Sequence, residues 1–333
     1  MSKGLVTLIG GSGFIGRYAA RALVDAGYRV RVACRRPHLA GDVRLAGAPG
    51  WVDLVQANIR NPQSLARACE GADVIVNLVG ILSEVGKQSF SDTQAEGARN
   101  AADAAKDAGA TRFVQVSAIG ASAKSRAAYA RTKAAGEAAV RDVFPDAVIL
   151  RPSIVFGPED GFFNRFAELA KSPAMSVLPF LPAIGSGKTR FQPVYAGDVA
   201  DAIVAAVSRE DALGKTYELG GPGTYTFNEL YDFIFETIDV KRFKAPLPFL
   251  IAKPMGLTFG ALFRYIPPLR WVLGEAPITG GQVEMLKTDN VVANGALTLA
   301  DLGVTEVESI EAIVPSYLWR FRDYGQFHEE TGG

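Results

Sequence analysis

Residues 5–17 read LVTLIGGSGFIGR, an apolar run that ends in spaced glycines. The apolar run predicts a buried strand, and the residues after the glycines have the period of an amphipathic helix. In such a turn Gly10 permits the tight bend, Gly13 lets the backbone approach a pyrophosphate, and Gly16 lets the helix pack closely on the strand. The free N–H groups at the helix start then face the phosphates. We therefore expect a dinucleotide-binding loop, with a plain glycine-rich turn as the alternative.

The alternation of apolar runs and helix-period segments continues over the first 155 residues. Nearly all-apolar strands separated by helices are typical of a parallel sheet that is covered on both faces. We expect strands at residues 5–9, 29–34, 51–56, 73–78, 112–117 and 147–151, and helices at residues 13–26, 64–69, 93–108 and 127–143. The predicted fold class is α/β, a Rossmann-like doubly wound parallel sheet with a smaller C-terminal lobe.

The boundary between the sheet and the lobe is expected near residue 220. A helix pattern at residues 199–208 and a strand pattern at residues 216–219 complete the alternation, which then stops. We expect an NAD(P)-binding domain over residues 1–220 and a small lobe over residues 221–333. Residues 158–193 contain several prolines and glycines, which mark irregular chain, and we expect them to contribute to the lobe side.

Composition narrows the classes of function. Lys and Arg balance Asp and Glu at 35 each, so no overall positive field favours nucleic acid. The two cysteines, Cys34 and Cys69, fall in an expected strand and an expected helix, which argues against a disulfide framework and favours a reducing compartment. The two histidines, His38 and His328, lie far apart without a ligand motif, so we expect no metal site.

Membrane-spanning and targeting signals are not visible in the sequence. No uninterrupted apolar stretch reaches the roughly 18 residues that a spanning helix needs. The N-terminus enters the first expected strand almost directly, so we expect neither a signal peptide nor a transit peptide. These features favour a cytoplasmic location.

The choice of dinucleotide is predicted from the end of the second strand. An NAD-selective fold places a carboxylate there, which accepts hydrogen bonds from the ribose hydroxyls. Residues 31–37 read RVACRRP, and the first acidic residue after them is Asp42. Arg35 and Arg36, together with Arg17 after the loop, offer guanidinium groups that bind a 2′-phosphate with two hydrogen bonds. We expect NADP(H) rather than NAD(H); the alternative is that these arginines are solvated surface residues.

A candidate catalytic set lies around the end of the fifth strand. Ser117 ends that strand, and YARTK begins twelve residues further along, at Tyr129. Tyr129 and Lys133 occupy positions i and i+4 of an expected helix and share one face. A free phenol has a pKa of about 10, and a neighbouring ammonium group lowers that pKa toward the working range. Ser117 would hydrogen-bond the reacting oxygen; the alternative is an exposed helical pair without a catalytic role.

These motifs resemble those of the extended and atypical short-chain dehydrogenase/reductases, which share the GxxGxxG spacing and the serine with YxxxK. The resemblance covers about residues 4–220. It implies that Lys133 also holds the nicotinamide ribose, and that Asn58 stands where related chains often carry an aspartate near the adenine. The cofactor contacts expected in total are Gly10, Ser12, Gly13, Phe14, Ile15, Gly16, Arg17, Arg35, Arg36, Asn58, Val79, Gly80, Ser117, Tyr129, Lys133, Arg151, Pro152 and Ile154.

Residues 240–274 contain six basic side chains and no acidic one. The stretch is also rich in large apolar groups, and Pro254, Pro267 and Pro268 interrupt it, so we do not expect it to span a bilayer. Apolar, aromatic and basic residues without acids are typical of a segment that lies on anionic lipid or on a hydrophobic partner. We expect an interfacial segment, with a lobe core that carries basic residues at its rim as the alternative.

Residues 10–18, 151–167 and 240–274 together resemble one narrower family, the NADPH-binding accessory subunits of respiratory complex I and their bacterial relatives. This resemblance covers nearly the whole chain. It implies a mainly structural cofactor, partner subunits of complex I, and a lobe that lies against the membrane surface. The expected location is then cytoplasmic and peripheral, on the inner face of the bacterial plasma membrane, or on the matrix side in mitochondria.

Three functions stay open at this point. The first is an accessory or assembly subunit of respiratory complex I whose fold is stabilised by NADPH. The second is an active NADPH-dependent short-chain reductase, epimerase or dehydratase linked to quinone metabolism, which the intact set of Ser117, Tyr129 and Lys133 favours. The third is an NADP(H)-sensing regulator, which is disfavoured because such proteins often lack the tyrosine.

Overall fold

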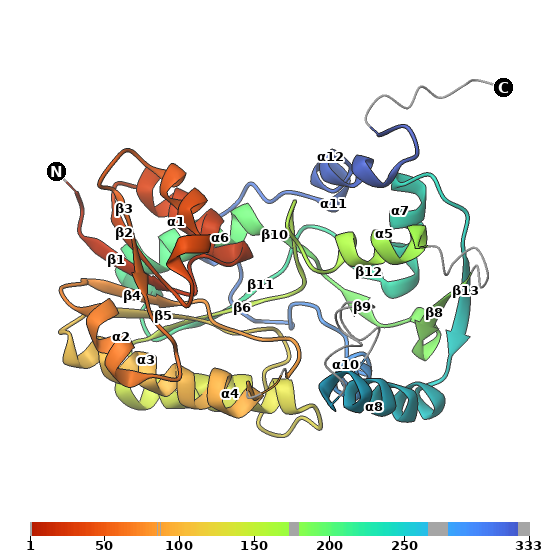
Figure 1. The fold of residues 1–333 in the computed structure, drawn as a ribbon, viewed down its shortest axis with the longest axis horizontal. Helices are drawn as coiled ribbons and strands as arrows, with labels where there is room; N and C mark the ends of the chain where they lie inside the picture. Colours follow the sequence, from red (N-terminus) through yellow and green to blue (C-terminus); the bar gives the residue numbers. More distant parts are fainter. Residues whose placement is uncertain (1, 85, 87, 173–179, 266–278, 326–333) are drawn as a thin grey trace. The chain divides into compact units, whose positions relative to one another are not determined.

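The computed structural model describes residues 2–84, 86, 88–172, 180–265 and 279–325 of the 333-residue chain (Figure 1). The chain forms two compact units. The first unit comprises residues 1–152, 196–220 and 292–306, and the second comprises residues 153–195, 221–291 and 307–333. The chain therefore passes between the units several times, and residues 292–306, which we expected in the lobe, belong to the first unit.

The first unit is built on a seven-stranded parallel sheet with the strand order β11-β6-β5-β4-β1-β2-β3. Its strands are β1 (Leu5–Ile9), β2 (Arg29–Cys34), β3 (Val52–Gln56), β4 (Val74–Asn77), β5 (Arg112–Val116), β6 (Val148–Pro152) and β11 (Thr216–Leu219). The chain order reverses between β1 and β4, and ligands of such sheets bind outside the carboxyl ends of the strands at that point. The predicted α/β class with a doubly wound parallel sheet is confirmed.

Helices cover both faces of this sheet (Figure 1). On one face α1 (Phe14–Asp25) packs with α6 (Ala196–Ser208); on the other lie α2 (Pro62–Cys69), α3 (Glu96–Asp107) and α4 (Ala128–Val143). Alanine and glycine form most of the buried sides of α1 and α3, so these helices approach their neighbours closely. Short 3-10 helices at Pro37–Leu39 and Gly41–Ala46 follow β2, and a π-helical turn at Ser91–Ala95 precedes α3.

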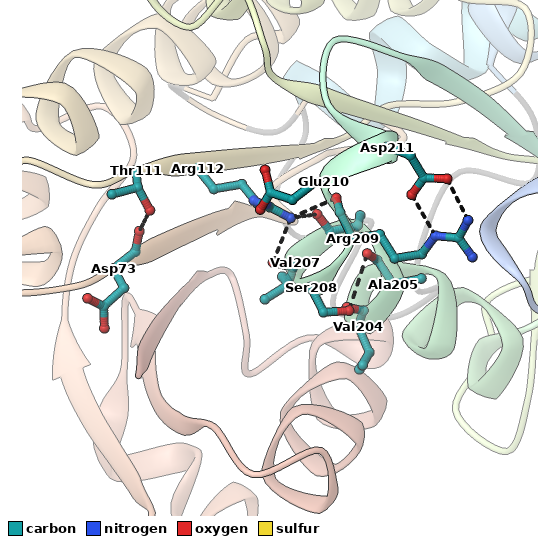
Figure 2. A network of polar contacts seen from close by, with 11 residues as sticks. Asp73, Thr111, Arg112, Val204, Ala205, Val207, Ser208, Arg209, Glu210 and Asp211 are labelled. Carbon is teal, nitrogen blue, oxygen red and sulfur yellow. Dashed lines mark hydrogen bonds and ion pairs between the residues drawn. The ribbon is translucent and has the colours of Figure 1, made fainter. Parts of the chain in front are cut away.

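Arg112, at the start of β5, holds the C-terminal end of α6 (Figure 2). Its buried guanidinium donates to the backbone carbonyl oxygens of Val207 and Arg209, each at 2.9 Å, and forms an ion pair with Glu210. The last carbonyl groups of a helix have no partner within the helix and carry partial negative charge. A buried cation satisfies both needs, so this cluster ties α6 to the sheet.

The second unit has an aromatic core, in which Phe156, Phe163, Phe227 and Tyr231 are buried. Around it pack α5 (Phe163–Lys171), α7 (Phe227–Thr237), α11 (Ile310–Ile313) and α12 (Pro315–Leu318). The described part of the unit also contains three two-stranded ladders: β7 (Val155–Phe156) with β10 (Val194–Tyr195), β9 (Arg190–Phe191) with β12 (Tyr225–Thr226), and β8 (Phe180–Ile184) with β13 (Phe243–Leu247).

Two further helices of the second unit pack against each other. α8 (Phe249–Tyr265) buries Ala252 and Gly256 against α10 (Gly280–Met285), and a small apolar cluster with Val283 and Ile184 forms between them. Among the helices that the structure describes, none combines the length and the apolar character that a bilayer crossing requires.

Candidate functional site

The glycine-rich turn joins β1 to α1 at the point where the sheet order reverses. Gly10 has a φ of +84°, a backbone conformation that residues with a side chain rarely adopt. Its N–H donates to the carbonyl oxygen of Ala33 at 2.8 Å, and its own carbonyl oxygen accepts from the N–H of Gly13 at 3.0 Å. These bonds hold the turn beside the end of β2, where the candidate arginines follow.

The glycines of the turn are required for different reasons. A Cβ on Gly16 would lie 2.5 Å from the Cα of Gly11, so the close packing of the helix start on the turn demands glycine there. Gly13 is exposed, and a Cβ on it would meet only the carbonyl oxygen of Gly10, at 3.4 Å. Nothing in the described chain therefore requires glycine at position 13, whereas a ligand that approaches the backbone would require it.

The start of α1 is open to an anion. Gly13 is the N-cap, no side chain caps the helix, and the first turn contains no acidic residue. The unpaired N–H groups and the positive end of the helix dipole therefore remain available to a phosphate. The expected contacts Phe14, Ile15 and Gly16 are the first residues of this helix. The open turn fits the pyrophosphate of a dinucleotide.

Two of the three candidate arginines are exposed. Arg35 and Arg36 follow β2 directly, and Arg35 donates from Nη1 to Oε1 of Gln88 at 3.5 Å. Arg17 forms an ion pair with Asp42 at 2.6 Å, and its Nε donates to the carbonyl oxygen of Ser12 at 3.4 Å. The first acidic residue after β2 thus pairs with an arginine, and Arg35 and Arg36 remain exposed to a ligand.

Asn58 and Val79 follow β3 and β4. The side-chain carbonyl oxygen of Asn58 accepts from the N–H of Arg60 at 3.1 Å, so it closes the local turn. Val79 packs on the glycine turn, since its Cγ2 would lie 2.9 Å from a Cβ on Gly10. Its N–H donates to Oδ1 of Asn77 at 3.1 Å. Val79 thus helps to shape the glycine turn, and the side chain of Asn58 is held by the backbone N–H of Arg60.

Ser117 directly follows β5, and its hydroxyl group makes no hydrogen bond to the described part of the chain. Its N–H donates to the carbonyl oxygen of Leu150 at 2.7 Å, which fixes its backbone at the sheet. The residue is only 4% exposed, yet its Oγ has no hydrogen-bond partner among the described residues. Buried hydroxyls are nearly always paired, so an unpaired one at the carboxyl end of a central strand fits a ligand oxygen.

Lys133 connects α4 to the ends of β4 and β5. It is buried, and its Nζ donates to the carbonyl oxygen of Val116 at 3.2 Å. A Cβ on Gly80 would lie 3.1 Å from Nζ, so the absence of a side chain at position 80 leaves room for the ammonium group. Burial lowers the pKa of Lys133 to about 8, while the carboxylate of Glu137 opposes this shift.

Tyr129 lies one helical turn before Lys133 on α4, and its ring meets that of Phe90 edge-on at 5.9 Å between centroids. Burial of the phenol raises the pKa of Tyr129 to about 12. From the sequence we expected the opposite direction, because Lys133 places an ammonium group one helical turn from the phenol and the sequence does not show how deeply the phenol is buried. The folded chain by itself therefore keeps Tyr129 a neutral phenol at neutral pH.

The expected contacts around β6 divide between the two units. Arg151 forms an ion pair with Glu137 through two hydrogen bonds, at 2.9 and 2.6 Å, so its guanidinium is engaged inside the first unit and is not free for a cofactor. The carbonyl oxygen of Pro152 accepts from the N–H of Ile119 at 3.0 Å. Ile154 belongs to the second unit, where its carbonyl oxygen accepts from Val194 at 2.9 Å.

One feature near α4 was missed by the sequence analysis. The expected helix over residues 93–108 begins instead as the π-helical turn Ser91–Ala95, a rare geometry that is frequent at functional sites. In this turn Gln94 is buried, and it donates to the carbonyl oxygen of Ile81 at 2.7 Å and accepts from the hydroxyl of Thr132 at 2.8 Å. The only signal in the sequence was a polar residue at a helix position that faces the core.

Comparison with known proteins places this chain in a family. Residues 6–220 match the model of the NAD dependent epimerase/dehydratase family. The alpha subcomplex subunit 9 of mitochondrial NADH dehydrogenase [ubiquinone] 1 from Arabidopsis thaliana is 36% identical over 90% of this chain and 73% of that protein. The subunit of the same name from Rattus norvegicus is 35% identical over 93% of this chain and 79% of that protein. The chain belongs to both families.

The chain is also similar to two reductases. The ceramide reductase of Caulobacter vibrioides is 35% identical over 61% of this chain and 61% of that protein. The solved structure of the triphenylmethane reductase of a Citrobacter species has a TM-score of 0.69 and 18% identity, covering 96% of this chain and 99% of that chain. At that identity the second similarity shows the fold alone. Membership of an NAD-dependent family indicates that the chain binds a nicotinamide dinucleotide.

Proposed function

We propose that this protein is an NADP(H)-binding accessory subunit of a membrane-bound NADH:ubiquinone oxidoreductase, respiratory complex I. The observation that carries the proposal is the similarity to subunits of that complex, which extends over both units rather than the dinucleotide-binding part alone. A subunit of this kind would lie peripherally at the membrane, on the cytoplasmic side in a bacterium and on the matrix side in a mitochondrion.

The phosphorylated dinucleotide is favoured by the charges after β2. Arg35 and Arg36 are exposed, and the acid that follows them, Asp42, is paired with Arg17. A carboxylate that accepts from ribose hydroxyls is the mark of an NAD-selective site, and none of the described contacts places one on these two arginines. Two exposed guanidinium groups without a carboxylate partner among the described residues would stabilise a 2′-phosphate dianion through charge-assisted hydrogen bonds.

The candidate residues would hold the dinucleotide along the carboxyl ends of the central strands. The glycine turn and the start of α1 would bind the pyrophosphate, while Lys133 would donate to the nicotinamide ribose. When bound, the cofactor supplies hydride-transfer chemistry. Ser117 offers a buried, unpaired hydroxyl to a ligand oxygen, and Tyr129 offers a protonated phenol that donates a hydrogen bond. Such a site binds and orients a dinucleotide even without turnover, which suits a structural cofactor.

A helix of the second unit supplies a surface for the membrane. Ala252 and Gly256 line the buried side of α8, whereas Leu250, Ile251 and Leu257 lie on another side of it and are 88%, 54% and 58% exposed. Leu250 and Leu257 stand at positions i and i+7 and share one face of the helix, and Ile251 lies roughly 100° around the helix from Leu250. We name these three exposed apolar residues the α8 stripe. A group of apolar side chains exposed to solvent marks a contact with lipid or with a hydrophobic partner.

The basic residues of the expected interfacial segment take a smaller part in this surface than the sequence suggested. Lys244 pairs with Asp232 at 2.6 Å, Lys253 pairs with Glu284 at 3.2 Å, and Arg242 donates to a backbone carbonyl oxygen. The described part of the segment contains a strand, β13, and a helix, α8, and most of the cations named above are bound within the unit. Residues 266–274 and the side chain of Arg264 lie outside the described part. The membrane contact proposed here depends on the α8 stripe.

An active reductase is the second candidate, and two observations favour it. The hydroxyl of Ser117 is unpaired and buried, and a ceramide reductase is among the relatives. In that case the chain would reduce a carbonyl group of a lipid-like substrate with NADPH, and Tyr129 would donate the proton to the developing oxyanion. Tyr129→Phe distinguishes the two functions, because it removes the proton donor and leaves the dinucleotide-binding turn intact.

The test of the proposal uses the protein in its native membranes. Gentle solubilisation and purification of the full-length chain should recover subunits of an NADH:ubiquinone oxidoreductase and a bound NADP(H). The Tyr129→Phe protein should recover the same subunits and the same nucleotide content. Recovery of the chain alone, together with a carbonyl reductase activity that Tyr129→Phe abolishes, would reject the accessory subunit and support the reductase.

A further inference from the structure

Glu137 lies on α4 one helical turn beyond Lys133 and two turns beyond Tyr129. Residues at these spacings share one face of a helix, so all three side chains face the same side of α4. Glu137 is only 8% exposed. A buried carboxylate is costly unless it is paired and hydrogen-bonded. A buried carboxylate so close in sequence to the candidate site therefore needs a structural or functional reason.

Arg151 on β6 fixes the orientation of this carboxylate. Its Nε donates to Oε1 of Glu137 at 2.9 Å and its Nη2 donates to Oε2 at 2.6 Å, the paired geometry in which a guanidinium holds a carboxylate most rigidly. Nη1 of Arg151 also lies 3.7 Å from Oε1 of Glu218 on β11. Oε2 of Glu218 in turn accepts from the backbone N–H of Ala293 at 2.9 Å.

These contacts form one connected string, Glu137–Arg151–Glu218, within the first unit. It starts on α4, one helical turn after Lys133, continues through Arg151 on β6 and ends at Glu218 on β11. The pairing with Arg151 leaves both oxygens of Glu137 in fixed positions, since two hydrogen bonds define the plane of the carboxylate. The string therefore holds the negative charge of Glu137 in a fixed position on α4, one helical turn after Lys133.

Two titratable groups share the Lys133 face of α4: the phenol of Tyr129, which is neutral, and the carboxylate of Glu137. Arg151 on β6 and Glu218 on β11 are the charged groups of the string. The π-helical turn that packs on α4 contributes the uncharged side chain of Gln94. The ends of β4 and β5 contribute Gly80, the carbonyl oxygen of Val116 and the hydroxyl of Ser117. Burial lowers the pKa of Lys133 to about 8, and among these groups it is Glu137 whose charge opposes that shift.

We propose that Glu137, oriented by Arg151 and Glu218, is a positioning residue that keeps Lys133 in its charged form for contact with the bound dinucleotide. This inference rests on the proposed function in one respect, the contact between Lys133 and the dinucleotide. Without a nearby anion, a buried ammonium group loses its proton near neutral pH, and it would then no longer attract the anionic ligand. Arg151 thereby acts on the site through Glu137 rather than by touching the cofactor.

The test is a titration of NADPH against full-length protein by the fluorescence of the bound nucleotide, repeated from pH 6 to pH 10. Lysine is charged below its pKa, so wild-type affinity should be constant at low pH and should fall as the pH rises through about 8. Glu137→Gln removes the anion and keeps the shape of the side chain. It should move this decline about one pH unit lower, while the affinity at the lowest pH changes little.

Two variants serve as controls. Asp142→Asn removes an exposed carboxylate from the same helix, where it pairs with Arg99, and should leave the midpoint of the decline unchanged. Lys133→Met should abolish the pH dependence, which identifies Lys133 as the titrating group. If Glu137→Gln does not fold, Glu137→Gln/Arg151→Met removes the buried pair together, a replacement that proteins often tolerate, and should shift the midpoint in the same direction by a smaller amount.

The outcomes separate this inference from the proposed function. If the wild-type protein binds no NADPH at any pH, the proposed cofactor is wrong and the inference falls with it. If the wild type binds NADPH and the Glu137 variants weaken binding equally at every pH, or leave the midpoint in place, the inference alone is wrong. A lower midpoint in those variants and an unchanged midpoint in Asp142→Asn support it.

Discussion

Gly16 and Gly11 approach so closely that a Cβ on Gly16 would lie 2.5 Å from the Cα of Gly11, whereas a Cβ on Gly13 would have space. Three glycines of one turn therefore have separable roles. Gly10 is required because its φ is positive, and Gly16 is required because the helix start packs closely on Gly11. Neither reason applies to Gly13. That difference allows the fold and the ligand to be tested independently.

Gly13→Ala should fold normally and should bind the dinucleotide about tenfold or more weakly, a loss of about 1.4 kcal/mol, because its methyl group occupies the space that the pyrophosphate needs. Gly16→Ala is the matched variant. It should destabilise the protein by about 2 kcal/mol, since its methyl group overlaps backbone atoms. Chemical denaturation and a nucleotide titration of both variants check this. Normal binding by Gly13→Ala would remove the phosphate-loop assignment.

Replacement of Arg35 and Arg36 by alanine should weaken NADPH binding far more than NADH binding. Each charge-assisted hydrogen bond to the 2′-phosphate contributes about 1.5–3 kcal/mol, so we expect a loss of at least tenfold for NADPH. Arg29→Ala, an exposed arginine at the other end of β2, is the control and should change neither affinity. Equal losses for both nucleotides in isothermal titration would show that these arginines do not select the phosphate.

Arg112→Ala should lower the free energy of unfolding by about 3 kcal/mol, because it leaves the carbonyl groups at the end of α6 without their buried donor. The measurement is urea denaturation at neutral pH. Arg99→Ala removes an arginine whose ion pairs with Asp103 and Asp142 are exposed, and it should cost less than about 1 kcal/mol. Similar losses in the two variants would mean that the cluster in Figure 2 does not hold α6.

Leu250→Glu/Leu257→Glu should reduce binding to lipid vesicles at least about tenfold, since each inserted leucine contributes about 1.5–3 kcal/mol of burial. Co-sedimentation with vesicles that contain anionic lipid measures the effect. Leu39→Glu/Leu45→Glu is the matched control, because these two leucines are also exposed but lie in the first unit. Unchanged sedimentation of the first variant, or an equal loss in the control, would exclude the α8 stripe as the membrane contact.

The fold and the glycine turn could be predicted because their signals are local in the sequence. Residues 5–17 contain the strand, the turn and the helix start next to each other, and the apolar strands that follow show a sheet covered on both faces. The return of residues 292–306 to the first unit could not be predicted. It depends on the bridge between Tyr217 and Leu297, a pairing between positions far apart in the chain.

The electrostatics of the candidate site were predicted less well, for a physical reason. A pattern of residues shows which charges exist but not how deeply they are buried or what they contact. Arg151 was expected among the cofactor contacts, but its guanidinium pairs with Glu137, which lies fourteen residues before it on another element. The sequence predicted that Lys133 lies one helical turn from Tyr129 on the same helix. Burial of the phenol, however, decides the direction in which the pKa of Tyr129 shifts.

The most direct test of the account is a side-by-side calorimetric titration of the wild-type protein with NADPH and NADH at pH 7. The open start of α1 and the two exposed arginines predict one dinucleotide per chain and NADPH affinity at least about tenfold higher than that for NADH. Equal affinities, a preference for NADH, or no heat with either nucleotide would contradict it.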